Sequence, residues 1–200
     1  MPLASTLPTI WVTGLPASGK RTLATAIADH LRVQGQVAEV IDSGRLRRTP
    51  LGATLGFSRD DRDTNMRRHA MAAAMLTRNG VLAVVSAVSP YRATREAIRA
   101  ELGEFIEVWV STPPAVCAER DQTGNWARAK AGELKGFTGV DAPYEAPAAP
   151  EFEVDLTQES VDAAALRVVS FLENRSTPSA ELEPDSENLT ADLDELGYSD

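Results

Sequence analysis

Five short apolar runs alternate with helical patterns along the chain, and this alternation restricts it to few folds. The runs are rich in β-branched residues, as strands are, and cover 9–14, 37–41, 81–86, 105–111 and 152–156. Helical spacing of apolar residues marks the segments between them, at 20–35, 61–79, 93–102 and 158–173. Strands that alternate with helices form a mainly parallel sheet through right-handed crossovers. The sequence therefore predicts an α/β fold, a parallel sheet flanked by helices.

Residues 14–20 read GLPASGK and directly follow the first predicted strand. This is the G-x-x-x-x-G-K pattern of a phosphate-binding loop (P-loop), in the strand-to-helix context that such a loop requires. Converging backbone N–H groups, a helix N-terminus and the Lys20 charge would bind phosphate. A tight turn with an incidental exposed lysine is the simpler alternative, but the context favours a fold of P-loop NTPase type. We expect ATP to be bound by Gly14, Leu15, Pro16, Ala17, Ser18, Gly19, Lys20, Arg21 and Thr22.

Length and composition predict one soluble domain. A chain of 200 residues that is 43% hydrophobic can bury one core, and no apolar run approaches the ~20 residues of a membrane span. The first residues do not resemble a signal peptide. The single cysteine, Cys117, suits a reducing compartment. We therefore expect a cytoplasmic protein that does not bind membranes.

The charge of the chain is concentrated at its C-terminus. Residues 176–200 contain eight acidic residues and no Lys or Arg; taking those eight charges from the total of −9 leaves −1 for residues 1–175. We therefore predict a domain over 1–175, able to hold local basic patches for a nucleotide, and a disordered acidic tail over 176–200. Leucines at helical spacing in the tail leave open a partner-binding turn. Residues 121–150, with four Gly and three Pro and no strand pattern, suggest a lid.

Several blocks in order resemble the adenylylsulfate kinases, which use ATP to phosphorylate the 3′-hydroxyl of adenosine 5′-phosphosulfate (APS). They are TIWVTGLPASGK (9–20), LGFSRDDRDTNMRR (55–68), SPYR (89–92), FIEVWV (105–110) and KAGELKGFTGVDAPYEAP (130–147). The resemblance runs from about Thr9 to Leu172. It implies that the chain makes PAPS, the 3′-phosphorylated product, for sulfate assimilation, with ATP and Mg²⁺ as cofactors. It also implies a lid at about 120–145 and leaves a homodimer possible.

The same resemblance implies residues for the acceptor nucleotide. Matched positions are Arg47, Phe57, Arg62, Asn65, Val88, Ser89 and Phe137. Guanidinium groups suit the phosphosulfate charge and aromatic faces can stack on adenine. For the neighbouring Arg67 and Arg68 we favour a solvated basic helix face instead. Nothing in the pattern indicates a nucleic-acid partner.

Three positions depart from the family pattern. The family has Ser or Thr where Arg21 stands, and the second Asp of its D-G-D-N-x-R segment is Gly44 here. The lid lysine of R-D-P-K-G is replaced by Thr123. We therefore expect Lys20 and Asp42 to carry the chemistry that remains, with Asp42 as a weak candidate metal ligand.

These departures leave two functions open. One is an active kinase for APS or a related nucleotide, in which Arg21 adds a cation where the metal's ligands would have been. The other is a catalytically weak nucleotide-binding protein used for sensing or assembly. The retained Lys20, Arg47 and Arg62 favour the kinase. A further alternative is that Arg21 points into solvent while Thr22 shifts inward.

Overall fold

The computed structural model describes residues 5–50 and 52–176. The chain divides into a unit of residues 1–170 and a second unit of 171–200. Of the second unit, only 171–176 are described, and they form the end of helix α7 (Val161–Ser176). The acidic tail therefore lies almost entirely outside the described residues, and both its disorder and the boundary at 175 stay predictions.

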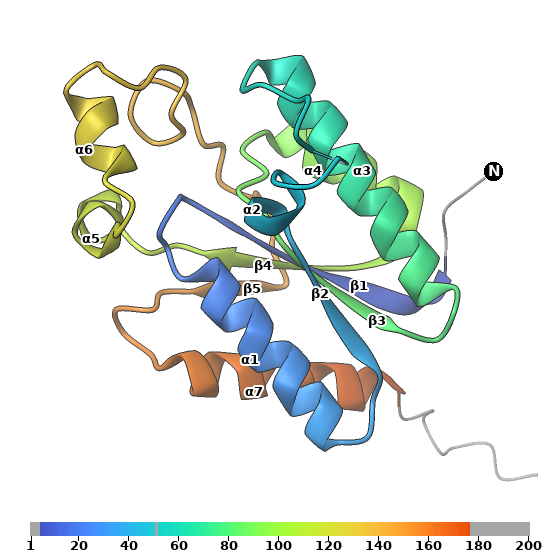
Figure 1. Ribbon diagram of the computed structural model, residues 1–200. Helices are drawn as coiled ribbons and strands as arrows, with labels where there is room; N and C mark the ends of the chain where they lie inside the picture. The colour runs from blue at the N-terminus through green and yellow to red at the C-terminus, as the bar shows by residue number, and fades with distance from the viewer. Residues whose placement is uncertain (1–4, 51, 177–200) are drawn as a thin grey trace, which may run out of the picture. The chain divides into compact units, whose positions relative to one another are not determined.

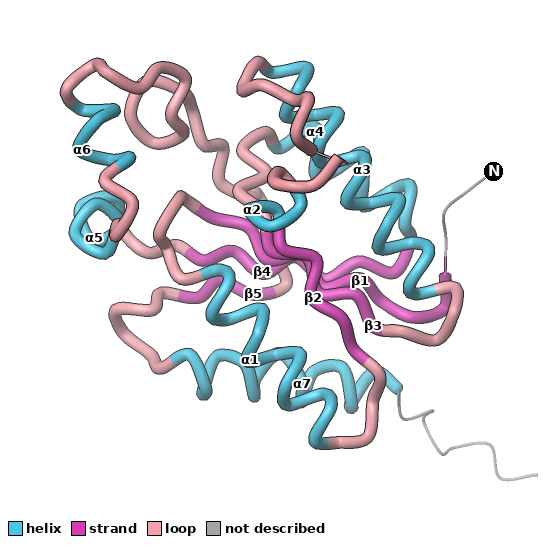
Figure 2. Tube along the Cα trace, in the orientation of Figure 1, coloured by secondary structure: helices cyan, strands magenta, loops and turns pink. Residues whose placement is uncertain are grey.

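The centre of the fold is a sheet of parallel strands, shown in magenta in Figure 2. Its strands are β1 (Ser5–Gly14), β2 (Ala38–Asp42), β3 (Leu82–Ser86), β4 (Gly103–Val110) and β5 (Phe152–Val154). They lie in the order β2-β3-β1-β4-β5, and every neighbouring pair is parallel. All five predicted strands are present, so the predicted α/β class with a parallel sheet is confirmed.

Helices cover both faces of this sheet (Figure 1). Helices α3 (Arg59–Thr77) and α4 (Arg92–Leu102) lie on one face, and α1 (Lys20–Val33) lies with α7 on the other. The sequence patterns did not predict three short helices, α2 (Ser43–Leu46), α5 (Pro114–Arg120) and α6 (Asn125–Lys130). With four to seven residues each, they are too short to show a helical period.

Two helix starts differ from the prediction because serine side chains cap them. Ser58 accepts a hydrogen bond from the Asp61 amide, and α3 begins two residues before the predicted start at 61. The Ser160 hydroxyl similarly accepts from the Ala163 amide at 3.1 Å, and α7 begins at Val161 rather than at 158. The capping serines therefore determine where these two helices begin, whereas the spacing of apolar residues predicted their starts only to within a few residues.

The core is built from the inner strands. Strand β3 is buried along its whole length, and Ile10, Trp11 and Val12 of β1 have no exposed surface. Burial on both faces explains why these strands read as continuous apolar runs instead of alternating ones. No helix among the described residues is long and apolar enough to cross a membrane.

The parallel register brings the carboxyl ends of four strands to one edge. Ser86 at the end of β3 is level with Asp42 on one side and with Val12 on the other. Gly14, which opens the predicted phosphate loop, is level with Val110. Loops that follow parallel strands emerge at this edge, so it is where a ligand site is expected.

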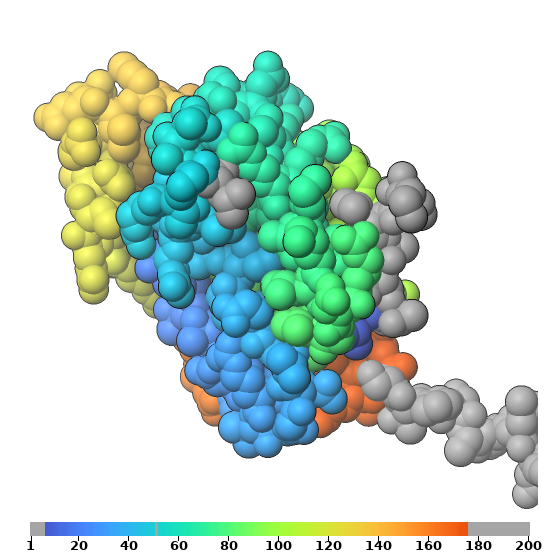
Figure 3. All heavy atoms as spheres, turned by 45° about the vertical axis from the view of Figure 1, so that its right-hand side comes forward, coloured from blue at the N-terminus to red at the C-terminus, as the bar shows by residue number. Residues whose placement is uncertain are grey.

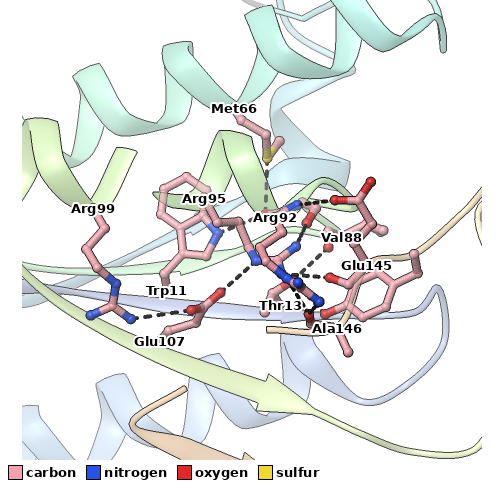
Figure 4. A network of polar contacts seen from close by, with 12 residues as sticks. Trp11, Thr13, Met66, Val88, Arg92, Arg95, Arg99, Glu107, Glu145 and Ala146 are labelled. Atoms are coloured by element: carbon pink, nitrogen blue, oxygen red, sulfur yellow. Dashed lines mark hydrogen bonds and ion pairs between the residues drawn. The ribbon is translucent and has the colours of Figure 1, made fainter. Parts of the chain in front are cut away.

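A buried ion-pair network lies at the same edge (Figure 4). Arg95 of α4 is 2% exposed and donates from Nε to Glu107 of β4 at 2.6 Å. Its other two nitrogens donate to the backbone carbonyls of Ser89, at 2.6 Å, and Glu145, at 2.7 Å. Arg95 thus ties together a helix, a strand and two loops that are distant in sequence.

We predict that Arg95→Ala is strongly destabilising. It leaves the buried Glu107 carboxylate without its closest cation and two carbonyls without a donor, a loss of about 3–5 kcal/mol in the free energy of unfolding. Arg67→Ala is the control, because it breaks the exposed Arg67–Glu101 pair and is expected to cost about 0–1 kcal/mol. Urea denaturation measures both. If the two substitutions lowered the free energy of unfolding equally, burial of the Arg95 network would make no contribution to stability.

Candidate nucleotide site

A cavity of about 830 Å³ opens at the carboxyl edge of the sheet. The phosphate loop forms one wall, and the start of α2 with α3 forms another. Residues 86–90, 120–123, Asn125, Phe137, Leu156 and Val161 also line it. In Figure 3 the residues that follow β2 (blue to cyan) lie beside the lid segment (yellow), which helps to enclose this edge.

Most of the predicted site residues meet in this cavity. Its lining includes every predicted acceptor residue and, from the phosphate side, Pro16, Ala17, Gly19, Lys20, Arg21, Thr22 and Asp42. Gly14, Leu15 and Ser18 do not line it. Ser18 is completely buried, and its carbonyl accepts from the Thr112 hydroxyl at 2.9 Å. These three residues shape the loop from behind, and their contact with ATP stays a prediction.

The loop backbone requires glycine at position 19. Gly19 has φ +101°, and a Cβ there would come within 2.5 Å of the Leu156 side chain. Ala17 also adopts positive φ, 63°, which is uncommon for a residue with a side chain. Sparsely populated backbone conformations of this kind gather at ligand sites. The loop thus combines two residues at positive φ with a position where a side chain would clash.

Lys20 lies at the base of the loop and is 8% exposed. Its ammonium group donates to the Leu15 carbonyl of the same loop. Burial lowers the pKa of Lys20 to about 8, although the nearby Cys117 and Asp42 partly oppose that shift. A phosphate group beside the ammonium would favour its charged form, so ligand binding and protonation of Lys20 are linked.

Arg21 is bound to the protein, which contradicts the alternative in which it points into solvent, although Thr22 does line the cavity as that alternative supposed. Its guanidinium donates to both oxygens of Asp42, from Nε to Oδ2 at 2.6 Å and from Nη2 to Oδ1 at 3.0 Å. Asp42 also caps α2 by accepting from the Arg45 amide at 2.7 Å. Burial opposes ionisation of Asp42, but these hydrogen bonds outweigh it and lower the pKa. The carboxylate is therefore ionised and bound within the protein.

The acceptor side is held by two arginines around one phenylalanine. Arg47 donates to the carbonyls of Leu55 and Gly56, and its Cζ lies 4.5 Å from the Phe57 ring centroid. Arg62 approaches the same ring at 5.6 Å. The Phe57 ring itself is 58% exposed, so a face remains open on which a base could stack.

Arg62 also links helix α3 to the lid, a role that the sequence did not suggest. It donates to the Phe57 carbonyl at 2.9 Å, to the Thr138 hydroxyl at 2.7 Å and to the Gly136 carbonyl. Thr138 is 76 residues away along the chain. This arginine therefore positions Phe137, which lies between its two lid partners, as well as lining the cavity.

Ser89 is held from several sides behind the acceptor pocket. Its hydroxyl accepts from Trp11 Nε1 at 2.8 Å and lies 3.2 Å from the sulfur of Met66, and its φ is 43°. Asn65 donates to the Ser43 hydroxyl at 3.3 Å. The adjacent Val88 carbonyl accepts from the Thr13 hydroxyl. Because the partners come from separate elements, the pocket wall is rigid.

The lid is packed against the phosphate loop. Trp126 of α6 is 2% exposed and donates from its indole nitrogen to the Pro16 carbonyl at 3.1 Å. The Phe137 ring meets Trp126 edge-on, with centroids 5.3 Å apart. A change in the loop can thus reach the Phe137 ring through one tryptophan.

Several residues of the site were missed from the sequence. They are Trp11, Met66, Arg95, Trp126, Tyr144 and Leu156. Trp11, Met66 and Leu156 read as ordinary apolar residues, and Arg95 reads as a polar helix residue. Trp126 carried a usable signal, because a large aromatic residue within a Gly-rich and Pro-rich segment needs something to pack against.

This combination defines a nucleotide-binding kinase class: a P-loop at the edge of a parallel sheet, a second basic and aromatic pocket, and a lid across both. The sequence model of the adenylylsulphate kinase family matches residues 7–155. The chain belongs to that family.

Relatives and solved structures agree with this assignment. An adenylyl-sulfate kinase of Rippkaea orientalis is 47% identical over 165 residues, which cover 82% of this chain and 91% of that protein. A probable adenylyl-sulfate kinase of Synechocystis is 48% identical over 160 residues, covering 80% and 90%. The structure of Mycobacterium tuberculosis APS kinase CysC in complex with AMPPNP and APS has a TM-score of 0.78 and 39% identity, covering 84% of this chain and 98% of that chain.

We predict that nucleotide binding takes up a proton near pH 9. Free Lys20, with a pKa of about 8, is then mostly neutral, whereas the phosphate-bound form is charged. At about pH 7 both forms are charged, and uptake by this group falls toward zero. Calorimetry of ADP binding in buffers of different ionisation enthalpy counts the protons.

Lys20→Arg is the matched variant, since a guanidinium stays charged at both pH values. Uptake at pH 9 should vanish in it and persist in the exposed-site control Lys130→Ala. Equal uptake by wild type and Lys20→Arg would assign the proton to another group.

Proposed function

We propose that this chain is an ATP-dependent adenylylsulfate kinase, which transfers the γ-phosphoryl group of ATP to the 3′-hydroxyl of APS and releases ADP and PAPS. One observation carries the proposal: a single cavity holds the phosphate loop, the predicted acceptor residues and the lid. Family membership over residues 7–155 supports it. A cytoplasmic location, a homodimer and a partner for the acidic tail remain predictions.

The two ends of the cavity suit the two substrates. Loop amides and Lys20 supply positive charge for the phosphates of ATP. Arg47 and Arg62 supply guanidinium donors for the phosphosulfate, and Phe57 and Phe137 supply faces for adenine. Phosphoryl transfer depends mainly on positioning and on electrostatic stabilisation of the transferring group. The lid contacts of Arg62 and Trp126 provide that positioning and limit the access of water.

The residues present do not fit a magnesium ion held by the protein. The hydroxyl after Lys20 is replaced by Arg21, and the second carboxylate is replaced by Gly44. The remaining carboxylate, Asp42, already accepts from Arg21 and from a backbone amide. Within residues 5–50 and 52–176, no cluster of three or more His, Cys, Asp or Glu side chains could bind a metal. No step of the proposed transfer is therefore assigned to a protein-held metal.

The direct test is APS-dependent formation of ADP together with chromatographic identification of PAPS. ADP release that does not depend on APS, or a product formed only with another nucleotide acceptor, would overturn the assignment. Calorimetry with APS and the ATP analogue separates a binding defect from a slow transfer step.

We predict that Arg62→Ala weakens APS binding by about 2 kcal/mol, the usual size of a charge-assisted hydrogen bond, and leaves ATP binding nearly unchanged. We expect APS binding to be affected more than ATP binding because Arg62 contacts the acceptor wall and the lid. Arg67→Ala removes an equal charge from the outer face of the same helix and should change neither affinity. Equal losses for APS and ATP would mean that Arg62 acts only through general stability of the lid.

A further inference from the structure

Two of the three departures of this chain from the family pattern, Arg21 and Gly44, meet in space. Arg21 and Gly44 lie 23 positions apart in the sequence, but both face Asp42 at the end of β2. A Cβ on residue 44 would lie 2.8 Å from Arg21 Nη2 and 3.2 Å from Asp42 Oδ1. The first distance is shorter than a real Cβ contact. A methyl group on residue 44 would therefore displace the end of the Arg21 side chain, whereas glycine leaves its two-point contact with Asp42 undisturbed.

The guanidinium is anchored at one side and open at the other. Asp42 is 7% exposed and lies at the end of a strand, which gives the anchor little freedom. The Arg21 side chain is 60% exposed and lines the cavity next to Lys20. Two of the five guanidinium N–H donors are used on Asp42, so donors remain for a ligand on the cavity side.

The position of this charge matters more than its presence. In a phosphate loop the residue after the lysine presents its hydroxyl to the metal that accompanies the phosphates. Here the same position presents a permanent cation with donors suited to phosphate oxygens. Asp42 fixes that cation in advance, so little conformational entropy is lost when phosphate binds.

We infer that Arg21, anchored by Asp42 and accommodated by Gly44, is a built-in phosphate-binding cation that takes the place of a protein-held divalent ion. The inference rests on the proposed function, because it concerns the ATP phosphates. Its consequence is that this chain binds a nucleoside triphosphate nearly as well without a divalent cation as with one.

The test is the affinity for AMPPNP, measured by calorimetry once in EDTA and once in Mg²⁺, with no acceptor present. For the wild type we expect the two affinities to agree within about threefold. Arg21→Ser should lower the affinity in EDTA by about tenfold or more, the size of a lost charge-assisted contact. Arg48→Ser is the control, because it removes the same charge from an exposed position outside the cavity lining and should leave both affinities unchanged.

A second comparison tests the link between residues 21 and 44. Gly44→Ala should lower the affinity in EDTA several-fold in the wild-type background and have no effect in the Arg21→Ser background, since the displaced group is then absent. Arg21→Ser with Gly44→Asp should reverse the metal dependence, with weak binding in EDTA and restored binding in Mg²⁺. A general folding defect would lower both affinities together and would not change their ratio.

A wild-type affinity that rises tenfold or more in Mg²⁺ would overturn the inference and leave the kinase assignment intact. The inference would also be overturned if Gly44→Ala changed the affinity in EDTA equally in the wild type and in the Arg21→Ser variant. If AMPPNP binds neither in EDTA nor in Mg²⁺, both the inference and the proposed function are wrong.

Discussion

The parallel pairing of β3 with its two neighbours is the constraint on which the site depends. It places the ends of β1 and β2 on either side of Ser86, so the phosphate loop and Asp42 open into one space. Neither segment could reach the other through local structure, because a helix and a loop separate them in sequence. The burial that stabilises β3 on both faces therefore also fixes the distance between Arg21 and Asp42.

The acceptor side depends on a different kind of interaction. Arg95 is buried and bonded to Glu107, Ser89 and Glu145, so charge and hydrogen bonds help to hold the wall behind the pocket. A buried ion pair adds little net stability compared with an apolar core, but its geometry is directional. Arg95 also donates to the carbonyl of Ser89, whose backbone has a positive φ of 43°.

The sequence could predict features whose cause is local. Continuous apolar runs indicated all five strands, and the GLPASGK segment predicted its own turn, because glycine and lysine at fixed spacing have few other uses. The family resemblance then predicted that Arg47, Phe57 and Arg62 belong to one site. The partners of these residues could not be predicted, because they depend on register and on lid packing: Arg62 meets Thr138 across 76 residues. Short helices such as α6 were not predicted, because they are too short to show a helical repeat of apolar residues.

Arg21 and Gly44 show why single departures from a family pattern mislead when each is considered alone. Read one at a time, one position has lost a hydroxyl and the other has lost a carboxylate, and both suggest decay of a metal site. Decay gives no reason for the two losses to be complementary in shape. In the structure, a Cβ on residue 44 would lie 2.8 Å from Arg21 Nη2, too close for that group to keep its place, and the surviving carboxylate binds the guanidinium at two points. Such fit between an added cation and the space left at residue 44 is what the proposed replacement of one charge by another requires.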